Sequence, residues 1–186
     1  MVAIILTTEE RPMKALVVVD VQNDFVSGSL GTKEAQEMLP RLMKKVEAFE
    51  GALFVTLDTH GEDYLQTQEG HNLPVVHCVR GTWGWELPAE LGALTDAKGA
   101  AVFEKPCFGS VRLAEELVKL HASESLESIE LVGLCTDICV ISNALLAKAA
   151  LPEVTISVDP ACCAGVTPEA HEAALATMRS CQIQGA

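Results

Sequence analysis

The chain has 186 residues, of which 49% are hydrophobic and 21% charged, and its formal net charge is −13. These values are typical of a globular protein of one domain and exclude a wholly disordered or fibrous chain. The acidic surface would be repelled by nucleic acids and anionic membranes, and no apolar run approaches the ~20 residues that span a bilayer, so we expect neither partner.

Residues 1–12 end in Arg11-Pro12 and lack the basic start of a signal peptide, so we expect a leader or extension followed by one domain over 13–186. Short apolar runs typical of strands covered on both faces occur at 15–19, 52–57, 100–103, 129–133 and 154–158. Helical patterns occupy 33–50, 111–121 and 136–150, and Thr167-Pro168 opens a last helix.

This alternation of strands and helices predicts an α/β fold, a three-layer α/β/α doubly wound parallel sheet of the Rossmann-like kind. Gln182-Ile183 would be a stub of a sixth strand. About forty residues between Thr59 and Gly99 show no clear periodicity and hold three of the five histidines and both tryptophans. Loops of that length in a compact domain are usually functional.

A polar residue follows each predicted strand, and the carboxyl ends of parallel strands share one edge of the sheet, where ligands bind. The residues are Asp20, Asp58, Lys105, Cys139 and Asp159. Taken singly, Asp20 fits a turn cap, Lys105 a surface lysine and Cys139 a core thiol. Taken together, a carboxylate, an amine and a thiol at one edge predict a catalytic group.

The three side chains suit nucleophilic catalysis. The start of a helix and the ammonium of Lys105 would lower the pKa of the Cys139 thiol, and Asp20 would accept its proton. The backbone N–H groups of Cys135 and Cys139 would form an oxyanion hole. Cleavage of a stable amide bond fits this two-step chemistry.

A second group comes from the long loop. Asp58 and His60 point the same way at a strand end, and the loop could bring His77 beside them. Two imidazoles and a carboxylate suit Zn²⁺, Fe²⁺ or Mn²⁺. Glu69 and His71 are further candidate ligands, although His60 and His77 could equally be ordinary loop residues.

Seven cysteines, an odd number without a CxxC pair, indicate free thiols in a reducing cytoplasm rather than a disulfide framework. Cys162-Cys163, in the expected loop after the fifth strand, fits two buried thiols. We expect a homo-oligomer. The apolar face of the helix at 144–151 could serve as its interface or equally lie under the sheet.

Three segments carry a resemblance to the isochorismatase-like cysteine hydrolases and, within them, to the nicotinamidase/pyrazinamidase branch. They are Ala15-Leu-Val-Val-Val-Asp20-Val-Gln-Asn-Asp-Phe25, Gly133-Leu-Cys-Thr136-Asp137-Ile-Cys139-Val140, and Asp58-Thr-His60 with His77-Cys78-Val79-Arg-Gly-Thr82. The third segment separates nicotinamidases from the isochorismatase branch, which lacks the metal.

The resemblance implies that Asp20, Lys105 and Cys139 are the catalytic triad and that Asp58, His60 and His77 bind one divalent transition metal, with zinc as first choice. It further implies that nicotinamide is hydrolysed through a thioester, with Phe25 and Cys135 beside the substrate and a cis peptide just before Thr136. The chain departs from the branch in its short stretch 105–110, where only Phe108 is aromatic, and in Pro74; Trp83 or Trp85 could compensate.

Four alternatives stay open. Another small amide or a vinyl ether could be the substrate, although the metal set argues against the latter. The metal could activate water directly, with Cys139 as a bystander. A flavin-binding domain would need a phosphate loop, for which residues 21–25 are poorly suited. A protein without catalytic activity would leave the triad unexplained.

Overall fold

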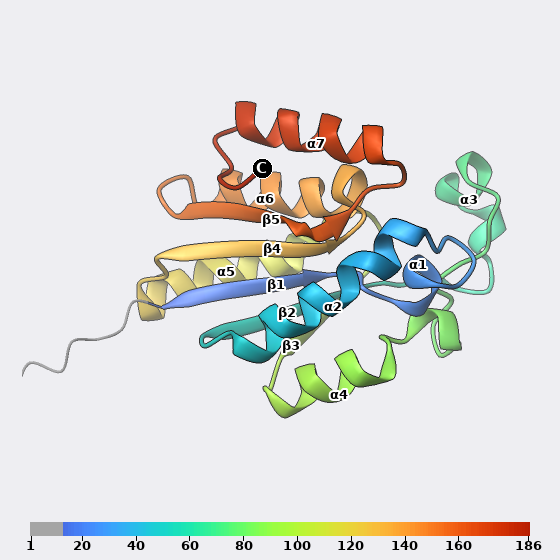
Figure 1. The fold of residues 1–186 in the computed structure, drawn as a ribbon, viewed down its shortest axis with the longest axis horizontal. Coiled ribbons are helices and arrows are strands. Elements are labelled where there is room, and N and C mark those ends of the chain that lie inside the picture. The colour runs from blue at the N-terminus through green and yellow to red at the C-terminus, as the bar shows by residue number, and fades with distance from the viewer. Residues whose placement is uncertain (1–12) are drawn as a thin grey trace, which may run out of the picture.

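Five parallel strands form the sheet of this computed structural model, which describes residues 13–186 (Figure 1). They are β1 (Lys14–Val19), β2 (Ala52–Asp58), β3 (Ala101–Lys105), β4 (Ser128–Leu134) and β5 (Thr155–Ala164). Their order is β3-β2-β1-β4-β5, and every pairing is parallel. The chain therefore winds in both directions from β1, as the predicted fold class requires. The expectation of a leader over residues 1–12 lies outside the described residues.

Helices cover both faces of the sheet because β1 is apolar on both sides. Val17 and Val19 pack in the core formed with α5 (Val111–Glu124), α6 (Ile141–Ala150) and α7 (Pro168–Ser180). Leu16 and Val18 pack in the core formed with α2 (Lys33–Ala48) and α4 (Ala89–Ala97). The predicted three-layer α/β/α architecture is thus confirmed (Figure 1).

Side-chain caps fix where α2, α5 and α7 begin. Thr32 accepts a hydrogen bond from the N–H of Ala35 at the start of α2, and Ser110 does the same at α5. Thr167 caps α7 with Pro168 in its first turn, as the sequence predicts. Each cap satisfies a backbone donor that the helix itself leaves without a partner.

The segment predicted as an aperiodic loop contains short helices. Besides α4 it holds α3 (Gln68–Asn72) and 3₁₀ turns at Tyr64–Gln66 and Trp83–Trp85. Only Leu91 and Thr95 of α4 are buried, so the helix lacks the strong one-sided pattern by which helices are predicted from sequence. A further short helix, α1 (Asn23–Val26), follows β1 directly.

The fifth strand runs to Ala164, six residues beyond its predicted end. Asp159 therefore lies within β5 rather than at the edge with the other polar residues, and its carboxylate pairs with Lys45 at 2.6 Å. Cys162 and Cys163 also lie in β5 and not in a loop, as buried free thiols. The expected sixth strand is reduced to one isolated bridge between Ser157 and Gln184.

The apolar face of α6 is used inside the molecule, since Ala144 and Ala147 are buried in the core under the sheet. That face does not supply the interface of the expected homo-oligomer, which stays a prediction. Among residues 13–186, no helix is both long enough and apolar enough to cross a membrane.

Gly133 sits where β4 meets β1, with φ of +122°, and a Cβ there would lie 2.2 Å from the carbonyl oxygen of Val19. We expect Gly133→Ala to lower the free energy of unfolding by about 3 kcal/mol, because it combines backbone strain with a clash against a buried strand. Urea denaturation measures the loss. Gly99→Ala is the control, since Gly99 also has positive φ but open space around it; an equal loss in both variants would contradict the steric argument.

Candidate active site

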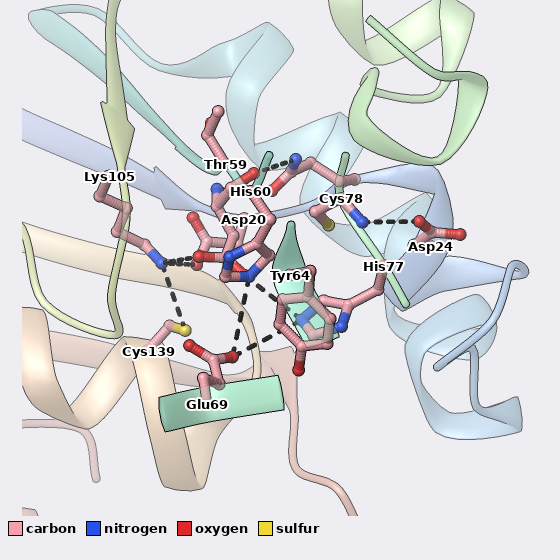
Figure 2. Close-up of polar contacts among 12 residues, drawn as sticks. Asp20, Asp24, Thr59, His60, Tyr64, Glu69, His77, Cys78, Lys105 and Cys139 are labelled. Carbon is pink, nitrogen blue, oxygen red and sulfur yellow. Dashed lines mark hydrogen bonds and ion pairs between the residues drawn. The ribbon is translucent and has the colours of Figure 1, made fainter. Parts of the chain in front are cut away.

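The thiol, amine and carboxylate predicted to converge do meet at the carboxyl edge of the sheet (Figure 2). Lys105 Nζ lies 2.6 Å from Asp20 Oδ2 and 3.5 Å from Cys139 Sγ. All three side chains are buried, with at most 4% of any residue exposed. Asp20 follows β1, Lys105 ends β3, and Cys139 lies in a π-helical turn, Thr136–Val140, that leads into α6.

Asp20 is held by its strand neighbour Thr56. The Thr56 hydroxyl donates to Asp20 Oδ1 at 2.6 Å, and the Asp20 N–H donates to the Thr56 carbonyl. Within residues 13–186 no group donates to Asp20 Oδ2 with hydrogen-bond geometry, so its 2.6 Å approach to Lys105 is a charge contact. Thr56 is a site residue that sequence reasoning missed, although it is the only hydroxyl in the apolar run 52–57.

The pKa of the Cys139 thiol differs from the expectation. Burial, followed by the carboxylate of Asp20, raises the pKa of Cys139 well above its usual value, and Lys105 only partly offsets this. The predicted lowering of the Cys139 pKa is therefore wrong: desolvation outweighs the helix start. Burial also raises the pKa of Asp20 despite Lys105, which makes it a stronger base. Burial alone would lower the pKa of Lys105, but the carboxylates of Asp20 and Asp58 raise it, so Lys105 stays charged.

The second predicted cluster also forms, and it contains a fourth member. One donor atom from each of Asp58, His60, Glu69 and His77 lies within 4.8 Å of the others. Asp58 Oδ2 is 3.0 Å from His60 Nε2 and 3.5 Å from His77 Nε2, and Glu69 Oε1 is 3.7 Å from both imidazole nitrogens. Zinc–ligand bonds of 2.0–2.1 Å in a tetrahedron require donors about 3.3 Å apart, so these four residues fit a divalent transition metal.

The surroundings prepare the same donors for a cation. His77 Nδ1 donates to the carbonyl of Val75 at 2.8 Å, which leaves Nε2 as the ligand atom. Burial alone would raise the pKa of Asp58, but hydrogen bonds from His60 and His77 and the charge of Lys105 hold it well below its usual value. Lys105 also donates to Asp58 Oδ1 at 3.2 Å and so links the two clusters. His71, the other candidate ligand, is exposed and lies outside the cluster.

A cavity of about 290 Å³ opens onto both clusters. Its lining includes Cys139, members of the four-donor set, and the two predicted substrate-contact residues Phe25 and Cys135. Phe108 lines it too, with 41% of its surface exposed. The tryptophans do not compensate for the missing aromatic residues. Trp83 is 60% exposed, and neither it nor Trp85 is among the described residues that line the cavity.

The backbone next to Cys139 contains a cis peptide bond and a tightly hydrogen-bonded turn. The cis peptide joins Leu134 to Cys135, one residue earlier than the bond next to Thr136 that the resemblance implies. The Cys135 carbonyl accepts hydrogen bonds from the N–H groups of Ile138 and Val140, which fixes the turn that carries Cys139. The N–H groups of Cys135 and Cys139 stay the predicted oxyanion donors.

A buried thiol, amine and carboxylate at the carboxyl edge of a parallel sheet, beside a site for a divalent metal, define the class of α/β cysteine hydrolases. The isochorismatase domain family matches residues 14–184. The chain therefore belongs to the isochorismatase family.

Relatives are similar to this chain along most of its length. The nicotinamidase/pyrazinamidase of Mycobacterium tuberculosis is 28% identical, with 92% of this chain and 97% of the relative covered. A crystal structure of nicotinamidase/pyrazinamidase from Bacillus subtilis superposes with a TM-score of 0.77 at 28% identity, covering 90% of this chain and 94% of that one. A structure of the pyrazinamidase of Pyrococcus horikoshii in complex with zinc has a TM-score of 0.74 at 26% identity, covering 92% and 97%.

Proposed function

We propose that this chain hydrolyses nicotinamide to nicotinic acid and ammonia through a thioester at Cys139. The observation that carries the proposal is that one cavity brings the buried thiol and the four-donor cluster together. A pyridine carboxamide presents a ring nitrogen and a carboxamide carbon on one rigid ring, which suits two such groups. The identity of the relatives supports the same substrate.

The metal would be held by Asp58, His60 and His77, with Glu69 as a fourth ligand. It supplies a Lewis acid for the ring nitrogen, and zinc suits these nitrogen and oxygen donors best, with manganese and iron as alternatives. The zinc complex of the pyrazinamidase relative supports that choice.

The chain's own residues account for the two chemical steps. Asp20 accepts the thiol proton as Cys139 Sγ bonds to the carboxamide carbon, while the N–H groups of Cys135 and Cys139 stabilise the oxyanion. Asp20 then protonates the nitrogen, the C–N bond breaks and ammonia leaves. Asp20 next takes a proton from water, whose oxygen adds to the thioester carbon; the C–S bond breaks and the sulfur regains its proton. Lys105 stabilises the thiolate.

Ammonia release from a panel of small amides tests the substrate. We expect the highest kcat/KM for nicotinamide and a value about 100-fold lower for benzamide, which has the same ring size but no ring nitrogen to ligate a metal. A preference for benzamide or for an aliphatic amide would favour the alternative, a hydrolase of another small amide. The exposed Phe108 and the short stretch 105–110 leave room for that alternative.

We also infer that residues 13–186 act as one catalytic domain, in the cytoplasm and as a homo-oligomer. All seven cysteines are free thiols, which supports a reducing compartment. Val111 and Val118 on α5 are 62% and 40% exposed and line an apolar groove, which supports a contact between subunits.

A further inference from the structure

The segment after β1 carries two polar side chains, Gln22 and Asp24, that contact the segments bearing the metal ligands. Neither has a role in the proposed chemical steps. Neither Gln22 nor Asp24 is among the described residues that line the cavity. Both nevertheless make hydrogen bonds to residues more than 30 positions away in the sequence, at the backbone of Asp58 and of Cys78.

Gln22 replaces a missing strand neighbour beside Asp58. The pairing of β1 with β2 ends at Val19 and Thr56, so Asp58 lies two residues beyond the last paired position. The Gln22 side chain is fully buried; its Oε1 accepts from the Asp58 N–H at 2.8 Å, and its Nε2 donates to the Asp58 carbonyl at 2.9 Å. Nε2 also donates to the carbonyl of Trp85 at 2.8 Å. One amide thus holds both backbone groups of a metal ligand.

Asp24 does the equivalent for the His77 segment (Figure 2). Asp24 Oδ2 accepts from the N–H of Cys78 at 2.8 Å, and Oδ1 accepts from the N–H of Ser29 at 3.2 Å. Cys78 is fully buried and has φ of +45°, a conformation that costs energy for a residue other than glycine. Its carbonyl accepts from the N–H of His60 at 3.0 Å. The peptide groups at Cys78 therefore fix two metal ligands, and Asp24 holds them in place.

The space around the Asp24 carboxylate is closed by backbone. A Cβ at Gly84 would lie 2.0 Å from Oδ2, and one at Gly28 would lie 2.4 Å from Oδ1. The carboxylate is enclosed between the turn after α1 and the 3₁₀ turn Trp83–Trp85, so it cannot easily move away from the Cys78 N–H. A carboxylate held in this way can fix the position of the Cys78 peptide group.

We propose that Gln22 and Asp24 are positioning residues of the metal site, Gln22 through Asp58 and Asp24 through Cys78 and His77. The inference rests on the proposed metal site and deepens it. Outer residues that orient ligands change metal affinity about 10–100-fold when they are removed. We therefore expect that removing Gln22 or Asp24 weakens metal binding but leaves the catalytic groups in place.

The test is the Kd for Zn²⁺, measured on metal-stripped protein by competition with a chromophoric chelator. We expect Asp24→Ala and Gln22→Glu to raise that Kd about 10–100-fold, and Asp24→Asn, which keeps one acceptor oxygen and is the variant safest for folding, to raise it less. Saturating zinc should restore ammonia release in each variant, because the catalytic groups are untouched.

Val46→Ala is the matched control. Val46 is fully buried near the end of α2 and, among the described residues, belongs neither to the four-donor cluster nor to the lining of the cavity. We therefore expect its truncation to lower thermal stability while the Kd stays at the wild-type value. Wild-type affinity in both Asp24→Ala and Gln22→Glu, or an equal loss in Val46→Ala, would overturn the inference. A wild-type protein that binds zinc but leaves nicotinamide intact would overturn only the proposed substrate, and one that binds no metal would overturn both.

Discussion

Replacing Cys139 with serine is expected to lower ammonia release from nicotinamide by about 10⁴-fold or more, because the bond-forming atom is lost. The serine hydroxyl nearly matches the thiol in size and should fold in the same pocket. Its proton is much harder to remove, and the alkoxide lacks the polarisable sulfur. Initial rates at saturating nicotinamide and zinc measure the loss.

The same experiment separates thiol catalysis from direct attack by metal-activated water. If the metal alone performed the reaction, Cys139→Ser would retain most of the wild-type rate. Rapid quenching of the wild-type protein with substrate, followed by mass spectrometry, should show a nicotinoyl group on the peptide that contains Cys139. Cys107→Ser is the control, since Cys107 is an exposed thiol and its loss should leave the rate unchanged.

The burial of the Cys139 thiol explains why this residue needs a base beside it. Burial raises the pKa of the thiol, so in the proposed mechanism the nucleophile forms as Asp20 takes the proton. In the same mechanism Lys105, which is charged and lies 3.5 Å from the sulfur, would stabilise the thiolate without rearrangement. The site is thus arranged for a thiolate that exists during the reaction and not before it.

The residues at strand ends could be predicted from the sequence because the carboxyl ends of parallel strands lie at the same edge of the sheet. Asp20, Asp58 and Lys105 need only the register of β1, β2 and β3, in which Asp58 pairs with Lys105. The same rule was wrong for Asp159. The Asp159-Pro160 pair has the composition of a strand end, but β5 is an edge strand, where a proline is tolerated, and the strand continues to Ala164.

Contacts that depend on loop geometry could be predicted only in part. Glu69 and His71 were both candidate ligands, and the sequence could not say that only Glu69 joins the cluster. Thr67 caps α3, the helix that carries both residues, and this helix is too short to show periodicity. The roles of Gln22 and Asp24 depend on backbone groups more than 30 residues away, which carry no side-chain signal at all. Their polarity directly after a buried strand was visible, but their partners were not.

Removing the carboxylate of Asp58 is expected to empty the metal site and stop turnover together. Asp58 contacts both His60 and His77, so Asp58→Ala takes away the donor that joins them, and we expect bound metal to fall from about one per chain to a trace after dialysis. Inductively coupled plasma mass spectrometry gives the metal content, and ammonia release gives the activity. Asp159→Ala is the control, because Asp159 is an ionised carboxylate paired with Lys45 away from this site.

Asp58 also accepts a hydrogen bond from Lys105, so its loss could act through the triad as well as through the metal. His77→Ala separates the two effects, since His77 contacts the Asp58 carboxylate but makes no described contact with Lys105. If the metal is what matters, both variants should lose metal and turnover in parallel, and a large excess of zinc should restore more activity in His77→Ala. Metal-stripped wild-type protein with undiminished turnover of nicotinamide would contradict the requirement for a metal.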